Sequence, residues 1–383
     1  MAFNISTISC FVPGRADATV RKMLSLYNPV ACVLLGDMPY ISKSLTAWGY
    51  SLSTLDKNST EQDFRDHYDQ FANHPAIKEL RNSNILIYSV FDDHEWGGND
   101  WDHSLVKANA TPSINAITQA DVNKHWKAGR DAHDYNVSTY YDNPPNTDLD
   151  AVVTAADRPE NALLEGQDPP VSDYSVAYWR QGFALDGSLD NVAPHLEIFT
   201  LDCMSYMDDI EKVDDANKTR LGPSQLAWFK AHLASSTATF KMIVSSKNTY
   251  GVSGGSNFDD WDTYTTERDD ILAFIAANSI TGVFWVSGDQ HVNNVAVQNT
   301  VEHTYDHFML NPCPFAQVYS ATTPTINTQT IWADKQQVFG LISVHQDYCD
   351  LSICNTATGK VLFKGSVLAG SNRYSVRDIP VAI

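Results

Sequence analysis

Short apolar runs typical of strands alternate with helix-like segments in the first quarter of this chain. Strand-like runs cover residues 5–9, 31–35 and 85–91, and segments with helical spacing cover residues 18–27 and 62–82. The run at 85–91 is apolar on both faces, which is typical of a strand buried in a parallel sheet. The alternation of strand and helix therefore predicts an α/β fold.

The same alternation returns further along the chain. It predicts strands at 195–202, 240–246 and 281–289, with helices at 222–236 and 266–280 between them. From residue 330 to residue 367 the pattern changes to consecutive antiparallel strands. We expect a central pair of sheets covered by helices, with a β-rich C-terminal part.

Residues 103–175 interrupt this pattern, because they are polar, rich in Asn, Asp and Pro, and only weakly periodic. We expect a long insertion with some helix, lying over one end of the sheet. The chain has 383 residues, 43% of them hydrophobic, which suffices for a large core. Without an internal repeat or a clear linker, we predict a single domain over residues 1–383.

The formal net charge is -20, which repels nucleic acid and anionic lipid, so neither is an expected partner. Apolar runs are too short for a membrane span. The first residues show no signal peptide, and secretion stays open for a chain whose leader has been removed. Six cysteines are too few for a disulfide scaffold, and we expect Cys349 and Cys354 to be free thiols.

Groups that bind cations follow several of the expected strands. They are Cys10, Asp37 with Tyr40, the run Asp92, Asp93, His94 and Glu95 with Asn99, then Asp202 with Cys203, and Asp289 with His291. Ligand sites in α/β sheets lie beyond the carboxyl ends of the strands. We therefore expect a site at this edge of the sheets.

Each of these residues also has an ordinary structural interpretation. Cys10 is a small core residue, His94 a surface ion pair, and Asp289 a cap. Asn99 and the Gly-Asp step before Met38 are typical of turns. The structural interpretation requires a separate explanation for each residue, whereas a single metal cluster accounts for all of the residues together.

The residue types also suit two different cations. A carboxylate can bridge two ions, phenolate and thiolate suit a trivalent iron, and carboxamide and carboxylate oxygens suit a divalent ion. Two such cations activate water and stabilise the charge on a phosphoryl group. They would also offset the repulsion of an anionic substrate by the net charge of the chain.

Several segments, in this order, resemble the PhoD-like (alkaline phosphatase D) family of the calcineurin-like metallophosphoesterases. The segments are "ISC", "LLGDMPY", "FDDHEWGGND", "FTLDCMSY", "LGPSQLAWFKAHLASSTATFKMIVSS", "WDTYTTERDDILAFI" and "VFWVSGDQH". The resemblance implies an α/β/β/α sandwich of two mixed sheets flanked by helices. It also implies a metal-dependent phosphoesterase, in which a hydroxide between two metal ions hydrolyses a small-molecule phosphate ester.

The resemblance assigns the ligands of a binuclear centre that holds Fe³⁺ and a divalent ion. Asp37 would bridge the two metals and, with His291, belong to the catalytic set. Cys10, Tyr40 and His291 would complete the iron site.

The second ion, Ca²⁺ or else Zn²⁺ or Mn²⁺, would be held by Asn99 and Asp289. His94 would stand outside the metals and orient or protonate the leaving oxygen. Trp261 and Arg268 also match the family pattern, and we interpret both as scaffold, with Arg268 in an ion pair on its helix.

The chain departs from the family where relatives carry two arginines and this sequence has Met204 and Met207. Arginine side chains bind phosphate through two hydrogen bonds, so their loss favours a less charged substrate such as a phosphodiester. The expected substrates are phosphodiesters, phosphomonoesters or both. Arg180 and Lys247 are the substitutes that the sequence offers, and it places neither in the site.

Two other functions stay open at this stage. One is hydrolysis of a different ester class on the same binuclear scaffold, because a fold does not fix the substrate. The other is a non-catalytic protein that binds a metal or a ligand.

Overall fold

The structure is a computed structural model, and it describes most of the chain. The described ranges are 2–11, 17–40, 59–97, 119–144, 178–250, 260–299, 305–316 and 330–376. Asn99 and much of the expected insertion at 103–175 lie outside these ranges. Within them, no helix has the length and apolar character that a membrane crossing requires.

The first sheet has seven strands and joins the N-terminal and C-terminal parts of the chain. Its order is β14 (Tyr374–Val376), β13 (Val361–Leu368), β12 (Tyr348–Asn355), β11 (Val338–Val344), β1 (Phe3–Ile8), β2 (Ala31–Leu34) and β3 (Leu86–Ser89). Strands β1, β2 and β3 run parallel, and β11 joins them antiparallel to β1. The sheet is therefore mixed, as predicted.

The second sheet also has seven strands. Its order is β10 (Thr330–Asp334), β8 (Asn293–Asn299), β9 (Asp306–Asn311), β7 (Val283–Ser287), β6 (Phe240–Ser245), β5 (Leu196–Leu201) and β4 (Trp179–Phe183). Strands β5, β6, β7 and β9 run parallel to one another, and β4 and β8 pair antiparallel with β5 and β9. One expectation was wrong: β10 does not continue into the C-terminal antiparallel run but pairs with β8, so the chain changes sheets between β10 and β11.

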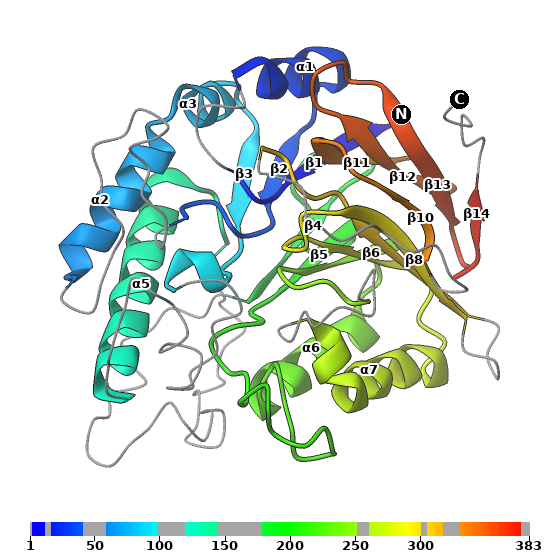
Figure 1. The fold of residues 1–383 in the computed structure, drawn as a ribbon. Helices are drawn as coiled ribbons and strands as arrows, with labels where there is room; N and C mark the ends of the chain where they lie inside the picture. The colour runs from blue at the N-terminus through cyan, green and yellow to red at the C-terminus, as the bar shows by residue number, and fades with distance from the viewer. Residues whose placement is uncertain are drawn as a thin grey trace.

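The main core lies between the two sheets. Ile5 and Val33 of the first sheet share one buried cluster with Val244 and Val286 of the second. Helices α1 (Asp17–Tyr27) and α3 (Pro75–Arg81) cover the outer face of the first sheet. Helices α6 (Pro223–Ser235) and α7 (Thr265–Ala277) cover the outer face of the second (Figure 1). The α/β/β/α sandwich expected from the sequence is confirmed.

The helical stretch expected at 62–82 is two helices. Helix α2 (Glu61–Ala72) ends before His74, and α3 begins at Pro75, its first residue. Proline cannot continue a helix that precedes it but fits the first turn of a new one, which explains the break. Helix α5 (Gln119–Tyr140) lies within the expected insertion and packs against α2.

A buried carboxylate joins α7 to the loop before α6. Glu267 is 6% exposed, and its carboxylate accepts hydrogen bonds from the backbone N–H groups of Arg220 and Leu221 at 2.5 and 3.3 Å. Burial raises the pKa of Glu267 to about 7, and these backbone hydrogen bonds only partly oppose that rise.

This shift gives a pH dependence of defined sign. Between pH 4.5, the ordinary value, and pH 7, folded Glu267 holds its proton more firmly than the unfolded chain does. The free energy of unfolding should therefore fall as pH rises through this window, by up to about 3 kcal/mol from this group. Glu267→Gln cannot titrate and should lack this part of the fall. Urea unfolding of both proteins at pH 5 and pH 7.5 measures it, and parallel pH profiles would contradict the assignment.

Candidate metal centre

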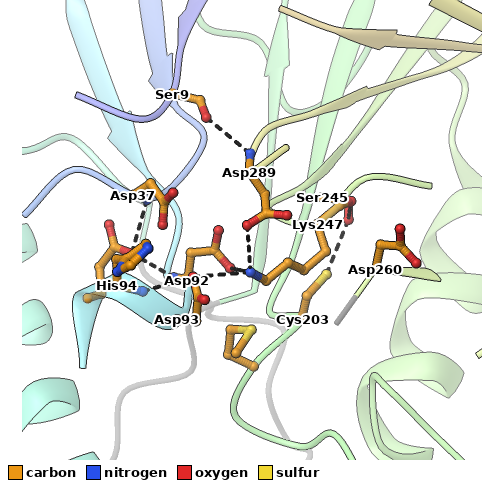
Figure 2. Close-up of polar contacts among 12 residues, drawn as sticks. Ser9, Asp37, Asp92, Asp93, His94, Cys203, Ser245, Lys247, Asp260 and Asp289 are labelled. Atoms are coloured by element: carbon orange, nitrogen blue, oxygen red, sulfur yellow. Dashed lines mark hydrogen bonds and ion pairs between the residues drawn. The ribbon is translucent and has the colours of Figure 1, made fainter. Parts of the chain in front are cut away.

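The carboxyl ends of strands from both sheets meet at one edge of the sandwich. Cys10 follows β1, Asp37 follows β2, Asp92 follows β3 and Asp289 follows β7. Figure 2 shows the carboxylates from these strand ends facing one another. The expectation that the strand ends would bring cation-binding groups together is met for Cys10, Asp37, Asp92, Asp93, His94, Asp289 and His291. It is not met for Asp202, which pairs with Arg130, or for Cys203, which lies in the core.

The first cluster contains the four residues predicted as iron ligands. The hydroxyl of Tyr40 donates to Asp37 Oδ2 at 2.8 Å and lies 2.8 Å from His291 Nε2. Cys10 Sγ lies 3.3 Å from Asp37 Oδ2. One ligand atom each of Cys10, Asp37 and His291 lies within 4.8 Å of the others. We call these four residues the thiol subsite.

The second cluster is built from carboxylates. Oxygen atoms of four residues lie within 4.8 Å of one another: Asp37, Asp92, Asp93 and Asp289. Lys247, which follows β6, extends into this group and pairs with three of them (Figure 2). We call the carboxylates of Asp92, Asp93 and Asp289 the aspartate subsite. Asn99, predicted as a ligand here, lies outside the described residues.

His94 lies close to both subsites. One of its ring nitrogens is within 4.8 Å of carboxylate oxygens of Asp37 and Asp93, and its ring centroid is 4.2 Å from that of Tyr40. It is 3% exposed. His94 therefore has the position of a group that could hold a proton next to the predicted metals.

Unusual backbone conformations turn these side chains towards one another. Four site residues have positive φ, namely Cys10 at 55°, Asp37 at 59°, Asp289 at 76° and His291 at 51°. Such values are uncommon outside glycine and cluster at functional sites, where surrounding contacts hold them. The strain is a local reason to interpret this edge as a site.

Glu95 holds the loop of Asp37 in place. Its carboxylate accepts hydrogen bonds from the backbone N–H groups of Asp37, Met38 and Asp92, at 3.1, 2.8 and 3.2 Å. Burial, and then the charge of Asp37, raises the pKa of Glu95 to about 8, against the effect of two of these N–H groups. The sequence analysis counted Glu95 among the groups that bind cations, and its contacts make it a positioning residue instead.

The electrostatics of Asp37 suit a metal ligand. Burial raises its pKa, but the charges of His94 and Lys247 and the hydrogen bond with His291 outweigh burial, so the pKa falls below its usual range. Among the described residues, Asp37 Oδ1 is buried without a hydrogen-bond partner. An ionised, buried oxygen of this kind requires a cation.

The neighbouring Asp92 also indicates a cation site. Burial, with the charges of Asp93 and Asp37, raises its pKa well above the usual range, although Lys247 opposes this. So many carboxylates at one buried place favour a bound cation, which would lower this pKa. The thiol, phenol, imidazole and carboxylate groups present are ligands that iron and divalent ions accept. The residues therefore fit the predicted metals.

Sequence reasoning missed Cys313. Its Sγ lies 3.0 Å from Cys10 Sγ, beside Ser9 Oγ at 3.6 Å. The signal was present, because Cys313 follows β9, which is parallel to β7 and ends at the same edge. All six cysteines are free and buried, including Cys349 and Cys354 as expected.

The structure also locates the possible substitutes for the missing arginines. Met204 and Met207 are fully buried in the core cluster under α6 and α7. Arg180 pairs with Glu197 at 2.9 Å on β4 and β5. Of the two candidates, Lys247 is the one that lies in the site.

The scaffold interpretation of the other two family positions agrees with their contacts. Trp261 is fully buried and donates to Ser245 Oγ at 3.0 Å. Arg268 pairs with Asp262 at 2.8 Å and Asp269 at 3.1 Å, so the predicted ion pair on its helix is confirmed.

Comparisons with known proteins agree with the sequence motifs. The family model for PhoD-like phosphatases matches residues 191–336. Alkaline phosphatase D of Bacillus subtilis (strain 168) is 28% identical over 109 residues, which is 24% of this chain and 19% of that protein. The resemblance to the PhoD-like family that the sequence motifs indicate is therefore confirmed.

Solved structures support the same fold. The structure of PhoD matches with a TM-score of 0.62 at 17% identity, covering 100% of this chain and 73% of that one. A purple acid phosphatase from yellow lupin (Lupinus luteus) seeds matches with a TM-score of 0.55 at 10% identity, covering 96% of this chain and 54% of that one. At these identities the likeness concerns the fold.

Only some residues of the candidate site lie within the matched regions. The span of the family model contains Lys247, Asp289, His291 and Cys313, while Asp37 and the other residues from the first three strand ends lie before it. The aligned stretch spans about a fifth of the length of the curated relative.

Gly36 provides a test of how closely the loop of Asp37 must fit. Its φ is 95°, and a Cβ there would lie 2.6 Å from Asp92 Cβ. We expect Gly36→Ala to destabilise the fold by about 1–3 kcal/mol and to lower metal occupancy, because the clash displaces Asp37 and Asp92. Thermal unfolding and elemental analysis measure the two effects.

Gly370→Ala is the matched control. Gly370 also has a positive φ, 67°, but has no atom within 4 Å of the added Cβ. Its substitution should cause backbone strain alone and leave the metal content unchanged. Equal metal content in the two variants would contradict the proposed close fit.

Proposed function

We propose that this PhoD-like chain is a metal-dependent phosphoesterase that hydrolyses small-molecule phosphate esters, diesters or monoesters or both. The observation that carries the proposal is the convergence of Cys10, Tyr40 and His291 on one oxygen of Asp37. The other oxygen of Asp37 is buried and lacks a hydrogen-bond partner among the described residues. The shared core between the sheets supports the further proposal of one domain over residues 1–383.

Two metal ions are proposed for the site. Fe³⁺ would be held by Cys10, Asp37, Tyr40 and His291, the set with soft and hard anionic groups. A divalent ion, Ca²⁺ or Zn²⁺ or Mn²⁺, would be held by Asp37 and Asp289 together with Asn99. When bound, the ions supply Lewis acidity, which activates water and neutralises charge that develops on the phosphoryl oxygens.

The residues of the chain have complementary tasks. Asp37 stays ionised, since its pKa is held low, and its two oxygens can face the two subsites. His94 lies beside Asp37 and Asp93 and is proposed to protonate or orient the leaving oxygen. Glu95 fixes the backbone of Asp37 through its hydrogen bonds.

The buried methionines bear on the substrate class. Because Met204 and Met207 lie in the core, no guanidinium fork for a dianionic phosphate is present at these positions. A phosphodiester carries less charge than a monoester and requires less of such a fork. The same observation favours the second candidate, hydrolysis of a different ester on this scaffold. A non-catalytic binding protein, the third candidate, would lack turnover with any ester.

The central test is Asp37→Asn. The change keeps the shape but removes the charge, so we expect at least one metal ion to be lost. Activity towards aryl phosphodiesters and monoesters should fall by about 10³ or more. Elemental analysis and steady-state kinetics measure both quantities, and an Asp37→Asn protein with full metal content and activity would refute the role of Asp37.

The control for this test is Asp350→Asn. Asp350 is a buried aspartate on β12, away from the strand ends of the site, that accepts from Ser366 Oγ at 2.5 Å. It also pairs with Lys364, whose side chain is 39% exposed, so water can solvate the lysine when the pair is lost. Asp202 is unsuitable, because it is fully buried and pairs with Arg130 at 2.9 Å. Breaking such a pair costs about 3–5 kcal/mol of stability and would obscure any effect on metals.

Iron at the thiol subsite predicts colour. A phenolate or thiolate bound to Fe³⁺ gives a visible charge-transfer absorption, so Tyr40→Phe should shift or abolish the band. Absorption spectra of both proteins at matched iron content measure this. An iron-free, colourless and fully active enzyme would show that the site works with divalent ions alone.

A further inference from the structure

Lys247 is buried among acidic groups at the centre of the aspartate subsite. Its side chain is 0% exposed, and its ammonium lies 2.9 Å from Asp289, 3.0 Å from Asp92 and 3.1 Å from Asp93. A lysine reaches such a place only if its partners offset the cost of removing the charge from water. Three carboxylates provide that compensation.

The ammonium lies against Asp289, a proposed ligand of the second metal ion. It contacts Oδ1 of Asp92, Asp93 and Asp289, and carboxylate oxygens of these residues and of Asp37 gather within 4.8 Å. A divalent ion bonds carboxylate oxygens at about 2.0–2.6 Å, so an ion held by Asp37 and Asp289 would lie next to the ammonium. The ion and the ammonium of Lys247 therefore compete for Asp289.

The two subsites differ in this respect. In the thiol subsite, a thiol, a phenol and an imidazole surround Asp37 Oδ2. In the aspartate subsite, a fixed positive charge already neutralises part of the carboxylate charge. An ion that enters the aspartate subsite must therefore displace a cation that the chain itself supplies.

We propose that Lys247 is a resident cation that competes with the second metal ion. The divalent ion enters the aspartate subsite only by displacing the ammonium, so the chain holds one ion tightly and takes the second only at higher concentration. Lys247 is then a specificity-determining residue for metal content. The inference rests on the proposed function only in that metal ions bind at the site, and it requires no catalytic step.

The test is a titration of chelator-treated protein with Mn²⁺, followed by calorimetry and elemental analysis. Lys247→Met removes the charge and keeps a long apolar side chain. We expect the wild type to bind one ion tightly and the second at least tenfold more weakly than Lys247→Met does. Lys241→Met is the matched control, since Lys241 is a buried lysine of β6 that donates to the carbonyls of Ala238 and Thr281. It should titrate like the wild type.

A second measurement covers the case in which Lys247→Met folds poorly. Without its lysine, the aspartate subsite leaves buried negative charge that an ion can neutralise. The melting temperature of Lys247→Met should therefore rise more on adding Mn²⁺ than that of the wild type or of Lys241→Met. An equal rise in all three proteins would overturn the proposal.

The possible results separate this inference from the proposed function. Equal affinity for the second Mn²⁺ in wild type and Lys247→Met, or no second ion in either, would overturn the role of Lys247. A tighter second site in Lys247→Met supports it even if no phosphate ester is hydrolysed. Hydrolysis with unchanged titration would leave the phosphoesterase proposal intact and reject the competition.

Discussion

The burial of several carboxylates at one edge of the sandwich is the constraint on which the rest of the site depends. The carboxyl groups of Asp37, Asp92, Asp93 and Glu95 are buried together, and Asp289, whose side chain is 13% exposed, lies beside them. Buried negative charge of this density is costly unless cations or hydrogen bonds offset it. Lys247, His94 and the backbone N–H groups that bind Glu95 provide part of this compensation within the chain. The proposed metals provide the rest.

The fold supplies this arrangement through its strand ends. Parallel strands in both sheets end at the same edge, and several of the residues that follow them have positive φ. Gly36 leaves room for Asp92, and Glu95 links the loops after β2 and β3. The two sheets that carry the site also share one core, which holds their strand ends side by side.

Much of this could be predicted from the sequence. The strand–helix alternation predicts two helix-covered sheets, and the polar residues after each strand predict where the site lies, because chain direction fixes which strand ends meet. The pairing of β10 with β8 could not be predicted, since the apolar pattern of β10 suits either sheet. The break before Pro75 was recognisable from proline alone.

Residues that act through long side chains or distant pairing were harder to predict. Lys247 follows a strand but resembles a surface lysine until its three carboxylate partners are located. Cys313 required knowledge that β9 lies parallel to β7. Glu95 has the capping-box spacing from Asp92, which predicts its hydrogen bond to that backbone. Its hydrogen bonds to Asp37 and Met38 could not be predicted, because they join the loops after two different strands.

A metal ion in the thiol subsite is what the proposed chemistry depends on. Anomalous X-ray diffraction at the iron edge, on crystals of protein purified without chelators, detects such an ion. We expect an iron peak bounded by Cys10 Sγ, the phenolate of Tyr40, Asp37 and His291. An iron-free subsite in active protein, or metal bound only among Asp92, Asp93 and Asp289, would contradict this expectation.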